Sequence, residues 1–382
     1  MREGWVELSL GELTENTRPI CYGVLKPGPQ VEGGVPLVKI TDMDRRILGP
    51  EGMQQISNEL DNEFRRSRLQ GGEVLLSIQG TVGRVAIAAS TLEGANISRT
   101  IAVIDPDDRL HNFYLMYVLE KIATEGNYDS AGSTRESLNI STIRSMKILC
   151  PPIPEQKRIV DLISSVDSYI EALQQHLESA KKARNAVLHE LLTARGDDWE
   201  EHKLIDMFEI YQPQTIAKSL MSEDGEFTVF GANGPIGRYH EFNHDEPEVV
   251  VTCRGATCGT VNMTPPKTWI TGNAMVVSPK TSEVSKEFLY WALVSGVDIQ
   301  SVISGSAQPQ ITREGLAPVK IKIPPLSRQV EIVDLISGFE LNISYLEESI
   351  HKTKTLRSGL LSDLLSGKHE IPASYDKVIG AA

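Results

Sequence analysis

The glycine-rich segment 231–237, Gly-Ala-Asn-Gly-Pro-Ile-Gly, is the sequence's best candidate for a cofactor-binding loop. Its spacing is Gly-x-x-Gly-x-x-Gly, whereas dinucleotide-binding loops use Gly-x-Gly-x-x-Gly and open a helix. Pro235 follows the second glycine, and no helical pattern comes after it. A tight turn that presents Asn233 and Arg238 is therefore the better interpretation.

Other motifs that would carry a reaction are missing from the sequence. No Gly-x-x-x-x-Gly-Lys-Ser/Thr segment for ATP and no Gly-x-Ser-x-Gly segment for a hydrolase occurs. Pro151-Pro152 and Pro265-Pro266 follow Cys150 and Thr264, not the Asn or Asp that would hold an amino group during methyl transfer. The histidines show no metal-ligand spacing, and Cys253 and Cys258 lack a nearby histidine pair. We expect no catalytic residue, metal or cofactor on this chain.

Side chains that could recognise nucleic acid gather instead around glycine turns in both halves of the chain. Arg, Asn and Gln can form paired hydrogen bonds with base edges, and Lys, Ser, Thr and Tyr can contact bases or phosphates. The candidates in the first half are Lys39, Thr41, Gln79, Thr81, Arg84, Ser98, Arg99, Thr134 and Arg135. Those in the second half are Asn233, Arg238, Tyr239, Arg254, Thr257, Asn273, Gln308 and Gln310. Each alone is an ordinary surface residue, and the prediction depends on their matched positions.

The elements that must position these residues occur twice. Residues 151–195 align without a gap to residues 324–368, and 16 of the 45 positions are identical. Both copies open with Pro-Pro-x-x-x-Gln and continue with Ile-Val-Asp-Leu-Ile-Ser. Ungapped identity at this level indicates an internal duplication.

Each copy predicts one long amphipathic helix, because its apolar residues recur at alternating spacings of three and four. Such a helix of about 40 residues is roughly 60 Å long. It cannot bury its apolar seam alone, so the two copies should pack on each other as an antiparallel coiled coil. Gly196 and Gly367 follow the helices, where a left-handed C-cap favours glycine. We expect the helices also to dock partners, with these residues involved: Gln156, Ile159, Leu173, Leu188, Gln329, Ile332, Leu346 and Leu361.

The segments before the two helices match more faintly, as residues 74–83 with residues 249–259. Short β-branched runs, glycine turns and one helix in each segment, near residues 112–125 and 286–295, predict two small mixed α/β (α+β) domains. The expected division is a first domain at 1–150, a central helix at 151–196, a second domain at 197–323, a second helix at 324–368 and a flexible tail at 369–382. The domains diverge more than the helices, which suggests one shared role for the helices and two different roles for the domains.

Composition and charge set further expectations. The 382 residues are 40% hydrophobic and 23% charged, which is typical of a globular protein. No apolar run approaches the roughly 20 residues of a membrane helix, and no signal peptide is recognisable, so we expect a cytoplasmic protein with four free cysteines.

The net charge of −13 is unusual for a protein that binds nucleic acid. Residues 1–150 contain 16 Lys and Arg against 20 Asp and Glu, and residues 198–323 contain 10 against 16. Two arginine groups, Arg45-Arg46 and Arg65-Arg66-Arg68, could still hold phosphates. We expect partner subunits to supply much of the phosphate contact, and these acidic residues to lie away from DNA: Glu241, Asp245, Glu246 and Glu248.

Over its whole length the chain resembles the specificity subunit of type I restriction–modification enzymes. The resemblance is carried by the two helix entries, by the helix endings at 191–196 and 364–368, and by the domain openings at 33–43 and 229–237. It implies two target-recognition domains that each read one half of an asymmetric, bipartite site in double-stranded DNA. It implies paired helices that set the spacer and dock two methyltransferase subunits. S-adenosylmethionine, ATP and Mg would be bound by the methyltransferase and restriction subunits, and this chain would have no activity alone.

Two other functions are compatible with the residues. One is a helical scaffold without sequence readout, which random-site selection that yields no motif would favour. The other is a cofactor-binding enzyme that uses residues 231–237, which a nucleotide-induced rise in melting temperature would support.

Overall fold

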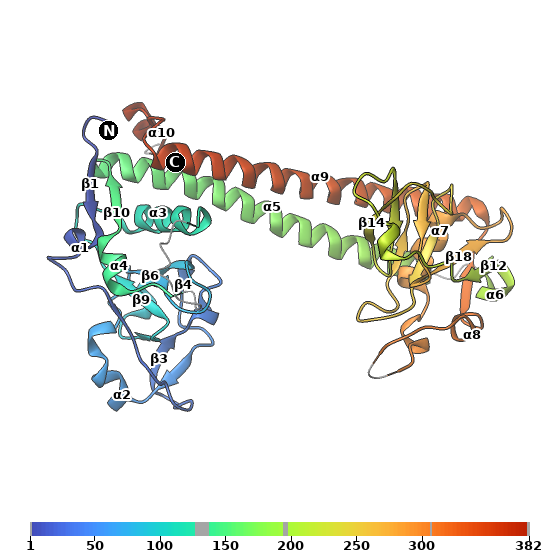
Figure 1. The fold of residues 1–382 in the computed structure, drawn as a ribbon, viewed down its shortest axis with the longest axis horizontal. Coiled ribbons are helices and arrows are strands. Elements are labelled where there is room, and N and C mark those ends of the chain that lie inside the picture. The colour runs from blue at the N-terminus through green and yellow to red at the C-terminus, as the bar shows by residue number, and fades with distance from the viewer. Residues whose placement is uncertain (1, 127–136, 194–197, 306–307, 380–382) are drawn as a thin grey trace. The chain divides into compact units, whose positions relative to one another are not determined.

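A computed structural model describes residues 2–126, 137–193, 198–305 and 308–379. The chain divides into two compact units (Figure 1): unit 1 is residues 1–172 with 350–382, and unit 2 is residues 173–349. Both boundaries lie inside the long helices α5 (Ile153–Thr193) and α9 (Leu326–Leu365). Each unit therefore contains one half of each long helix together with one α/β domain.

The domain of unit 1 contains three small sheets. A five-stranded sheet has the order β2 (Cys21–Tyr22), β9 (Ile101–Ile104), β6 (Val74–Ser77), β7 (Val85–Ala88), β4 (Ile47–Leu48). A three-stranded sheet has the order β5 (Gln54–Ile56), β3 (Val35–Val38), β8 (Asn96–Ile97), with β3 and β8 parallel. An antiparallel pair joins β1 (Val6–Ser9) to β10 (Lys147–Cys150). Its helices are α1 (Leu10–Leu13), α2 (Asn58–Glu63), α3 (Asn112–Thr124) and α4 (Ile140–Ser145).

The domain of unit 2 repeats this plan. Its four-stranded sheet has the order β12 (Phe208–Tyr211), β18 (Ala274–Pro279), β15 (Val249–Thr252), β16 (Val261–Met263). Its three-stranded sheet has the order β14 (Pro235–Tyr239), β13 (Phe227–Phe230), β17 (Thr268–Ile270), with β13 and β17 parallel. The outer pair is β11 (Glu200–Lys203) with β19 (Lys320–Ile323). The helices are α6 (Leu204–Met207), α7 (Lys286–Trp291) and α8 (Arg313–Leu316).

The strand orders of the two domains correspond element by element, so the internal repeat and the mixed α/β fold are confirmed. Unit 1 adds β4 and α2 to the shared plan. The short β-branched runs of the sequence form β6, β7 and β9 of the five-stranded sheet, β15 and β18 of the four-stranded sheet, and β3 of a three-stranded sheet. The helix predicted at 286–295 is α-helical only to Trp291 and then continues as a wider turn over 292–296.

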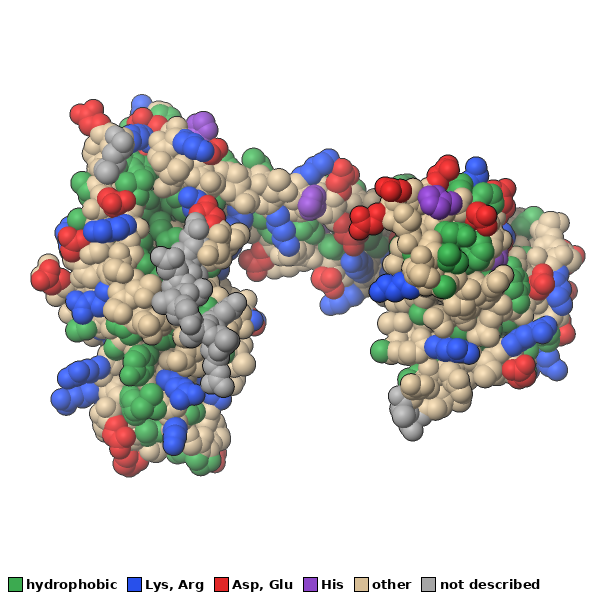
Figure 2. Space-filling view, in the orientation of Figure 1, with side chains coloured by type: hydrophobic (Ala, Val, Ile, Leu, Met, Phe, Trp, Pro, Cys, Tyr) green, Lys and Arg blue, Asp and Glu red, His purple; other side chains and the backbone are tan. Residues whose placement is uncertain are grey.

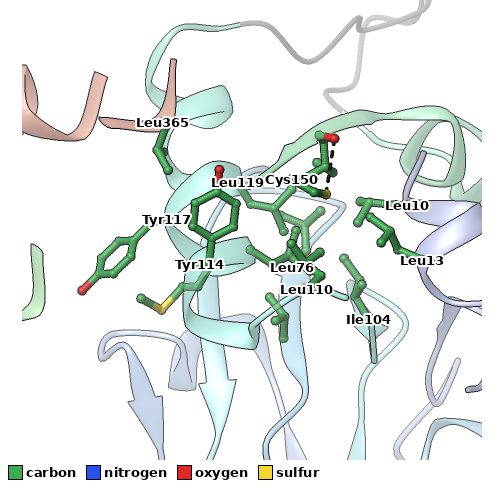
Figure 3. Close-up of a cluster of buried hydrophobic side chains, with 14 of the residues drawn as sticks. Leu10, Leu13, Leu76, Ile104, Leu110, Tyr114, Tyr117, Leu119, Cys150 and Leu365 are labelled. Carbon is green, nitrogen blue, oxygen red and sulfur yellow. Dashed lines mark hydrogen bonds between the residues drawn. The ribbon is translucent and has the colours of Figure 1, made fainter. Parts of the chain in front are cut away.

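In unit 1 the domain and the long helices share one hydrophobic core. Tyr114, Leu115 and Leu119 of α3 belong to the same buried cluster as Ile159 of α5 and Leu365 of α9. Figure 3 shows part of this cluster, with Leu365 beside the side chains of α3. Full burial of one such side chain stabilises the fold by roughly 1.5–3 kcal/mol. The domain is therefore fixed to the helices by its own core.

Unit 2 is built in the same way from the other halves of the helices. Ile332 and Ile336 of α9 and Leu188 and Leu192 of α5 belong to the cluster that contains Phe288 of α7. In each unit the first half of one long helix packs with the second half of the other, so the helices are antiparallel as predicted.

The glutamine of each Pro-Pro-x-x-x-Gln entry locks the start of a long helix to its domain. Gln156 is fully buried, its Oε1 accepts the backbone N–H of His111 at 2.8 Å, and its Nε2 donates to the carbonyls of Arg109 and Pro151 at 2.9 and 2.8 Å. His111 is the N-cap of α3. The amide thus satisfies a backbone donor at the start of α3 and two carbonyls in the adjoining turns.

Gln329 makes the same three bonds in unit 2. Its Oε1 accepts from Ser285, the N-cap of α7, at 3.0 Å, and its Nε2 donates to the carbonyls of Glu283 and Pro324 at 2.8 and 3.0 Å. We call these two constellations the glutamine clamps.

The clamps correct one prediction, because all eight residues expected to dock partners have buried side chains within this chain. Gln156 and Gln329 are occupied by the clamps. The six apolar residues are no more than 8% exposed because they belong to the domain cores or to the seam between the helices, so they leave no surface for a partner: Ile159, Leu173, Leu188, Ile332, Leu346 and Leu361.

An ion pair between the long helices is also repeated. In unit 1, Arg357 of α9 pairs with Asp167 of α5 and lies 5.7 Å from the ring centre of Tyr117 of α3. In unit 2, Arg184 of α5 pairs with Glu340 of α9, 5.7 Å from the ring centre of Trp291. The two pairs differ by the repeat offset of 173, and each also touches an aromatic residue of its domain.

The C-terminal tail, predicted to be flexible, packs on α5 over its described residues. Ile371 is buried, Tyr375 donates a hydrogen bond to Asp161 at 2.8 Å, and Asp376 pairs with Arg158 at 2.7 Å. The last described residues of the tail form α10 (Asp376–Ile379). The prediction was wrong because the apolar and acidic residues of this segment have partners on α5 that its low-periodicity sequence does not reveal. The expected cap Gly367 is left-handed with φ +72°, and Gly196 lies outside the described residues.

The clamps give a first testable prediction. Replacement Gln329→Leu keeps the side-chain volume but leaves one buried N–H and two carbonyls without partners, so we expect the free energy of unfolding to fall by about 3 kcal/mol. Urea denaturation of the full chain followed by circular dichroism measures the change. Gln174→Leu, at an exposed position of α5, is the matched control. Equal stability of the two variants would contradict the clamp.

Candidate nucleic-acid interface

The loop between β6 and β7 holds three of the predicted site residues on a rigid backbone. Ser77 is fully buried, and its Oγ donates to the carbonyl of Thr81 at 2.6 Å and accepts the N–H of Arg84 at 2.7 Å. Gly80 and Gly83 have φ of +80° and +93°, a conformation that favours glycine. The side chains of Gln79, Thr81 and Arg84 are consequently exposed on a fixed turn.

Neighbouring segments bring further predicted residues to this turn. Arg84 donates to the carbonyl of Ile40 at 3.2 Å, between Lys39 and Thr41. The N–H of Arg99 bonds the carbonyl of Val24, and Gln79 forms a β-bridge with Ser137. We call Lys39, Thr41, Gln79, Thr81, Arg84 and Arg99 loop cluster 1.

One predicted residue of unit 1, Ser98, is not part of this surface. Ser98 is buried, and its hydroxyl shares a 2.7 Å hydrogen bond with Thr100, so it supports the loop rather than facing a ligand. Its prediction as a contact residue is wrong because a buried hydroxyl is satisfied inside the domain. Thr134 and Arg135 lie outside the described residues.

Unit 2 repeats the geometry around Arg254. The N–H of Ile311 bonds the carbonyl of Cys253 at 3.0 Å, as the N–H of Leu138 bonds the carbonyl of Ile78 at 2.9 Å in unit 1. Arg254 and Gln310 therefore form a β-bridge at the place that Gln79 and Ser137 occupy. The matched loops predicted from the sequence repeat thus meet matched pre-helix segments in both domains.

Other predicted residues of unit 2 surround this bridge. Thr252 bonds the carbonyl of Ala232, next to Asn233, and Cys253 bonds the carbonyl of Asn273 at 3.0 Å. The turn after Arg254 has Gly255 and Gly259 at φ +92° and +89° and exposes Thr257. We call the following exposed residues loop cluster 2: Asn233, Arg254, Thr257, Asn273, Gln308 and Gln310.

A polar cavity of about 300 Å³ opens in loop cluster 2, lined by Gln212, Arg254, Gln310, Ile311, Thr312, Arg313 and Glu314. Ile311 also lines the cavity, and its side chain is almost completely buried. Two guanidinium groups and two amides at its rim supply the donors that recognise base edges or phosphates.

Two predicted residues lie at the far end of the β13–β14 hairpin. Arg238 donates to the carbonyls of Gly225 and Glu226 at 2.6 and 2.7 Å. Tyr239 stacks edge-on against Trp269 with ring centres 5.3 Å apart. The prediction grouped them with Asn233 because they are near in sequence, but β14 is extended and carries Arg238 roughly 10 Å along the hairpin from Pro235. Arg238 holds the hairpin together.

The sequence did not single out Gln212, Arg313 or Tyr22. Pairing with β9 and β18 makes Tyr22 the structural equivalent of Gln212, since Cys21 faces Val103 as Tyr211 faces Val276. Tyr22 is 49% exposed, beside the segment that contacts Arg99. Insertions between the repeats hide this equivalence, and only strand register reveals it.

In the unit 2 domain, acidic residues near the start of β15 lie away from loop cluster 2. Glu248 is buried in a 2.8 Å ion pair with Lys286 at the start of β15, whereas Arg254 follows the end of that strand. Asp245 and Glu246 immediately precede Glu248, so these acidic residues lie at the opposite end of β15 from loop cluster 2. On the face drawn in Figure 2, Lys and Arg are interspersed with Asp and Glu on both units.

Two of the five arginines predicted to contact phosphates already form ion pairs within the chain. Arg46 pairs with Glu120 and Asp167 at 3.0 and 2.6 Å, and Arg68 pairs with Asp61, so both are already neutralised. Arg45, Arg65 and Arg66 are exposed.

Burial favours the neutral forms of three titratable groups in the unit 2 domain. Burial lowers the pKa of His244, whose Nε2 shares a 2.8 Å hydrogen bond with the hydroxyl of Tyr211. Burial also raises the pKa of Tyr211 and of the Cys258 thiol. The cavity lining itself contains two basic side chains, Arg254 and Arg313, and one acidic side chain, Glu314.

Comparison with known proteins decides the family. The model of the type I restriction modification DNA specificity domain matches this chain twice, at residues 3–182 and 196–353. The chain belongs to this family.

Individual relatives and solved structures agree with this family assignment. The EcoBI specificity subunit of Escherichia coli is 26% identical over 196 residues, which is 50% of this chain and 40% of that protein. The putative MjaX specificity subunit of Methanocaldococcus jannaschii is 21% identical over 372 residues, covering 88% and 87% of the two chains. The S subunit structures from M. genitalium and Thermoanaerobacter tengcongensis match with TM-scores of 0.60 and 0.51 at 16% and 17% identity. They cover 94% and 97% of this chain and 96% and 98% of those chains, and they show the shared fold.

Other kinds of site are not evident in the described part of this specificity protein. Across those residues, no group of three His, Cys, Asp or Glu side chains could hold a metal ion. None of the described helices is long and apolar enough to span a membrane. The four cysteines carry free thiols.

The contrast between two arginines gives a prediction for the specificity protein. We expect Arg238→Ala to lower the free energy of unfolding by about 1–2 kcal/mol, because two hydrogen bonds to the hairpin are lost. Arg254→Ala, which removes an exposed side chain, should leave stability unchanged. Thermal denaturation of the two full-length variants makes the comparison, and equal destabilisation by both would refute these assignments.

Proposed function

We propose that this chain is the DNA-reading subunit of a type I restriction–modification complex, with loop clusters 1 and 2 each reading one half of a bipartite, asymmetric site. The observation that supports this most directly is the repeated geometry of the clusters. Both present Arg or Gln side chains on turns held by the same backbone hydrogen bonds, yet the side chains differ. The same scaffold with different reading residues suits two different half-sites.

Readout in loop cluster 2 would rely on Arg254 and Gln310. The β-bridge between these residues sets their backbones side by side, so an Arg and an amide could address adjacent base edges in the major groove. Gln212 and Arg313 stand at the rim of the same cavity and would extend the contact. In loop cluster 1, Gln79 takes the place of Arg254, and Arg84 and Arg99 supply the charge.

The long helices would set the spacer between the half-sites and dock two methyltransferase subunits. Shared cores fix each domain to the helices, which supports a rigid spacer role. The chain would be non-catalytic, with adenine methylation, S-adenosylmethionine, ATP and Mg assigned to partner subunits in the cytoplasm.

A first test changes the reading residues. We expect Arg254→Ala or Gln310→Ala to relax one half of the recognised motif, and Gln79→Ala to relax the other, because a lost paired contact costs about 1–3 kcal/mol of discrimination. Co-expression with a cognate modification subunit and methylation mapping of the host genome measures the motif. Arg328→Ala, whose side chain pairs with Glu331 on α9, is the control and should leave the motif intact. A variant that altered both halves would contradict one-domain, one-half-site reading, and random-site selection without any motif would favour a scaffold.

A second test addresses the acidic charge. Phosphate contacts make DNA affinity salt-dependent, and neither domain carries a basic excess. We expect the isolated chain to bind duplex DNA weakly, and the assembly with the modification subunit to bind at least tenfold more tightly and with a steeper salt dependence. Gel-shift titrations at several salt concentrations measure both quantities. No gain of affinity on assembly would overturn the proposed division of contacts.

A further inference from the structure

Ile236 is the extra residue of a β-bulge in the β13–β14 hairpin. Gly237 of β14 faces Val229 of β13. Pro235, two residues earlier, faces Phe230, which is the next residue of β13, so Ile236 lies between them without a partner across the ladder. A β-bulge redirects the side chain of the extra residue. Ile236 is 55% exposed and is the most exposed of the large apolar side chains recorded for the described residues of the unit 2 domain.

The three glycines of segment 231–237 allow the hairpin to present Ile236 in this way. A Cβ atom on Gly231 would lie 2.5 Å from Cγ2 of Ile236, so the glycine makes room for the isoleucine side chain. Gly234 has a φ of +131°, which favours glycine in the turn. A Cβ atom on Gly237 would lie 3.0 Å from Sδ of Met221, which packs closely against the strand. The Gly-x-x-Gly-x-x-Gly spacing is therefore explained by the bulged hairpin and not by a cofactor.

Hydrogen bonds fix the tip of this hairpin beside the end of β15. The hydroxyl of Thr252 donates to the carbonyl of Ala232. Nδ2 of Asn262 in β16 donates to Oδ1 of Asn233 at 2.8 Å. Ile236 follows the tip by three residues, so a fixed backbone presents it at the same end of the domain as loop cluster 2.

The internal repeat shows that the fold does not require an exposed apolar residue at this place. Val38 of β3 and Phe230 of β13 are equivalent, because each accepts the N–H of the residue that follows its parallel partner strand. The strand register then makes Met53 the counterpart of Ile236. Met53 is partly buried and packs against a hydrophobic cluster of unit 1. Unit 2 thus exposes an apolar side chain where unit 1 covers one.

The position of Ile236 among polar reading residues indicates what it contacts. The major groove of DNA admits a two-stranded β-ribbon such as this hairpin, and the C5-methyl group of thymine is the apolar feature that a base presents there. Asn233, Arg254 and Gln310 offer hydrogen bonds to base edges, but a methyl group neither donates nor accepts one. Contact between the methyl group and an exposed isoleucine removes apolar surface of both from water, which is favourable.

We propose that Ile236 is a specificity-determining residue that contacts the C5-methyl group of a thymine in the half-site read by unit 2. This apolar contact adds to the hydrogen bonds of Arg254 and Gln310. Unit 1 has no equivalent contact, because Met53 is packed into its own domain. The inference rests on the proposed reading of duplex DNA by loop cluster 2.

The test removes each side of the contact separately, using the full chain in complex with its co-expressed modification subunit. The probe is a duplex that carries the motif mapped for the wild type, with 2′-deoxyuridine in place of each thymine of the half-site in turn, which deletes only the methyl group. Ile236→Ser removes the apolar side chain from the protein. Val294→Ser, at a 44% exposed apolar position in the turn after α7, is the matched control. Fluorescence anisotropy titrations give Kd, and circular dichroism checks the fold.

We expect deoxyuridine at one thymine to weaken binding by the wild type and by Val294→Ser about fourfold, which corresponds to the loss of one buried methyl-sized group. Ile236→Ser should bind the thymine duplex as weakly as the wild type binds that deoxyuridine duplex, and deoxyuridine should then cause no further loss. A wild type that is insensitive to deoxyuridine at every thymine of the half-site would overturn the contact. So would a folded Ile236→Ser variant that keeps the wild-type sensitivity. If the wild-type complex binds the motif no more tightly than a duplex of random sequence, the proposed function fails and this inference with it.

Discussion

The structure depends on a shared core between each reading domain and the pair of long helices. Without that core, each domain would be free to move relative to the helices. The helices could then not fix the orientation of its reading loops. The glutamine clamps make the connection directional as well as hydrophobic. Each buried amide accepts the backbone N–H of the N-cap residue of a domain helix and donates to two turn carbonyls. A domain that rotated on the helices would leave these groups unpaired in a dry environment, which is costly.

The long helices were predictable because their signal is periodic and occurs twice. Apolar spacing of three and four over forty residues specifies a helix pair, and the repeat supports it independently. The same pattern misled the assignment of docking residues. Gln156 resembles any polar residue near a helix start, and sequence does not show that its amide is enclosed. Whether such a glutamine holds the helix to its domain or contacts a partner depends on whether its side chain is buried. That burial depends on elements that are distant in the sequence.

The loop residues were only partly predictable from the sequence. The glycine turns were found from their matched sequences, and the structure joins them to the matched pre-helix segments. Gln212 and Tyr22 were missed because their equivalence depends on strand register, which insertions obscure. Arg238 was misplaced because closeness in sequence was taken for closeness in space. In both loop clusters backbone hydrogen bonds and buried hydroxyls hold the turn, so the exposed side chains are free to change without loss of the fold. This explains why the domains have diverged while their plan has not.

The repeated ion pairs have a consequence for the history of the fold. Asp167 pairs with Arg357, and Glu340 pairs with Arg184. In the internal repeat Asp167 corresponds to Glu340, and Arg184 corresponds to Arg357, so the two pairs are the same contact made twice. In an isologous dimer, position i of one subunit meets position j of the other and the reverse contact also forms. The pairs within this chain obey that rule. They imply an ancestral single-domain protein that associated with its own copy, before gene fusion released the two reading surfaces from the requirement to be identical.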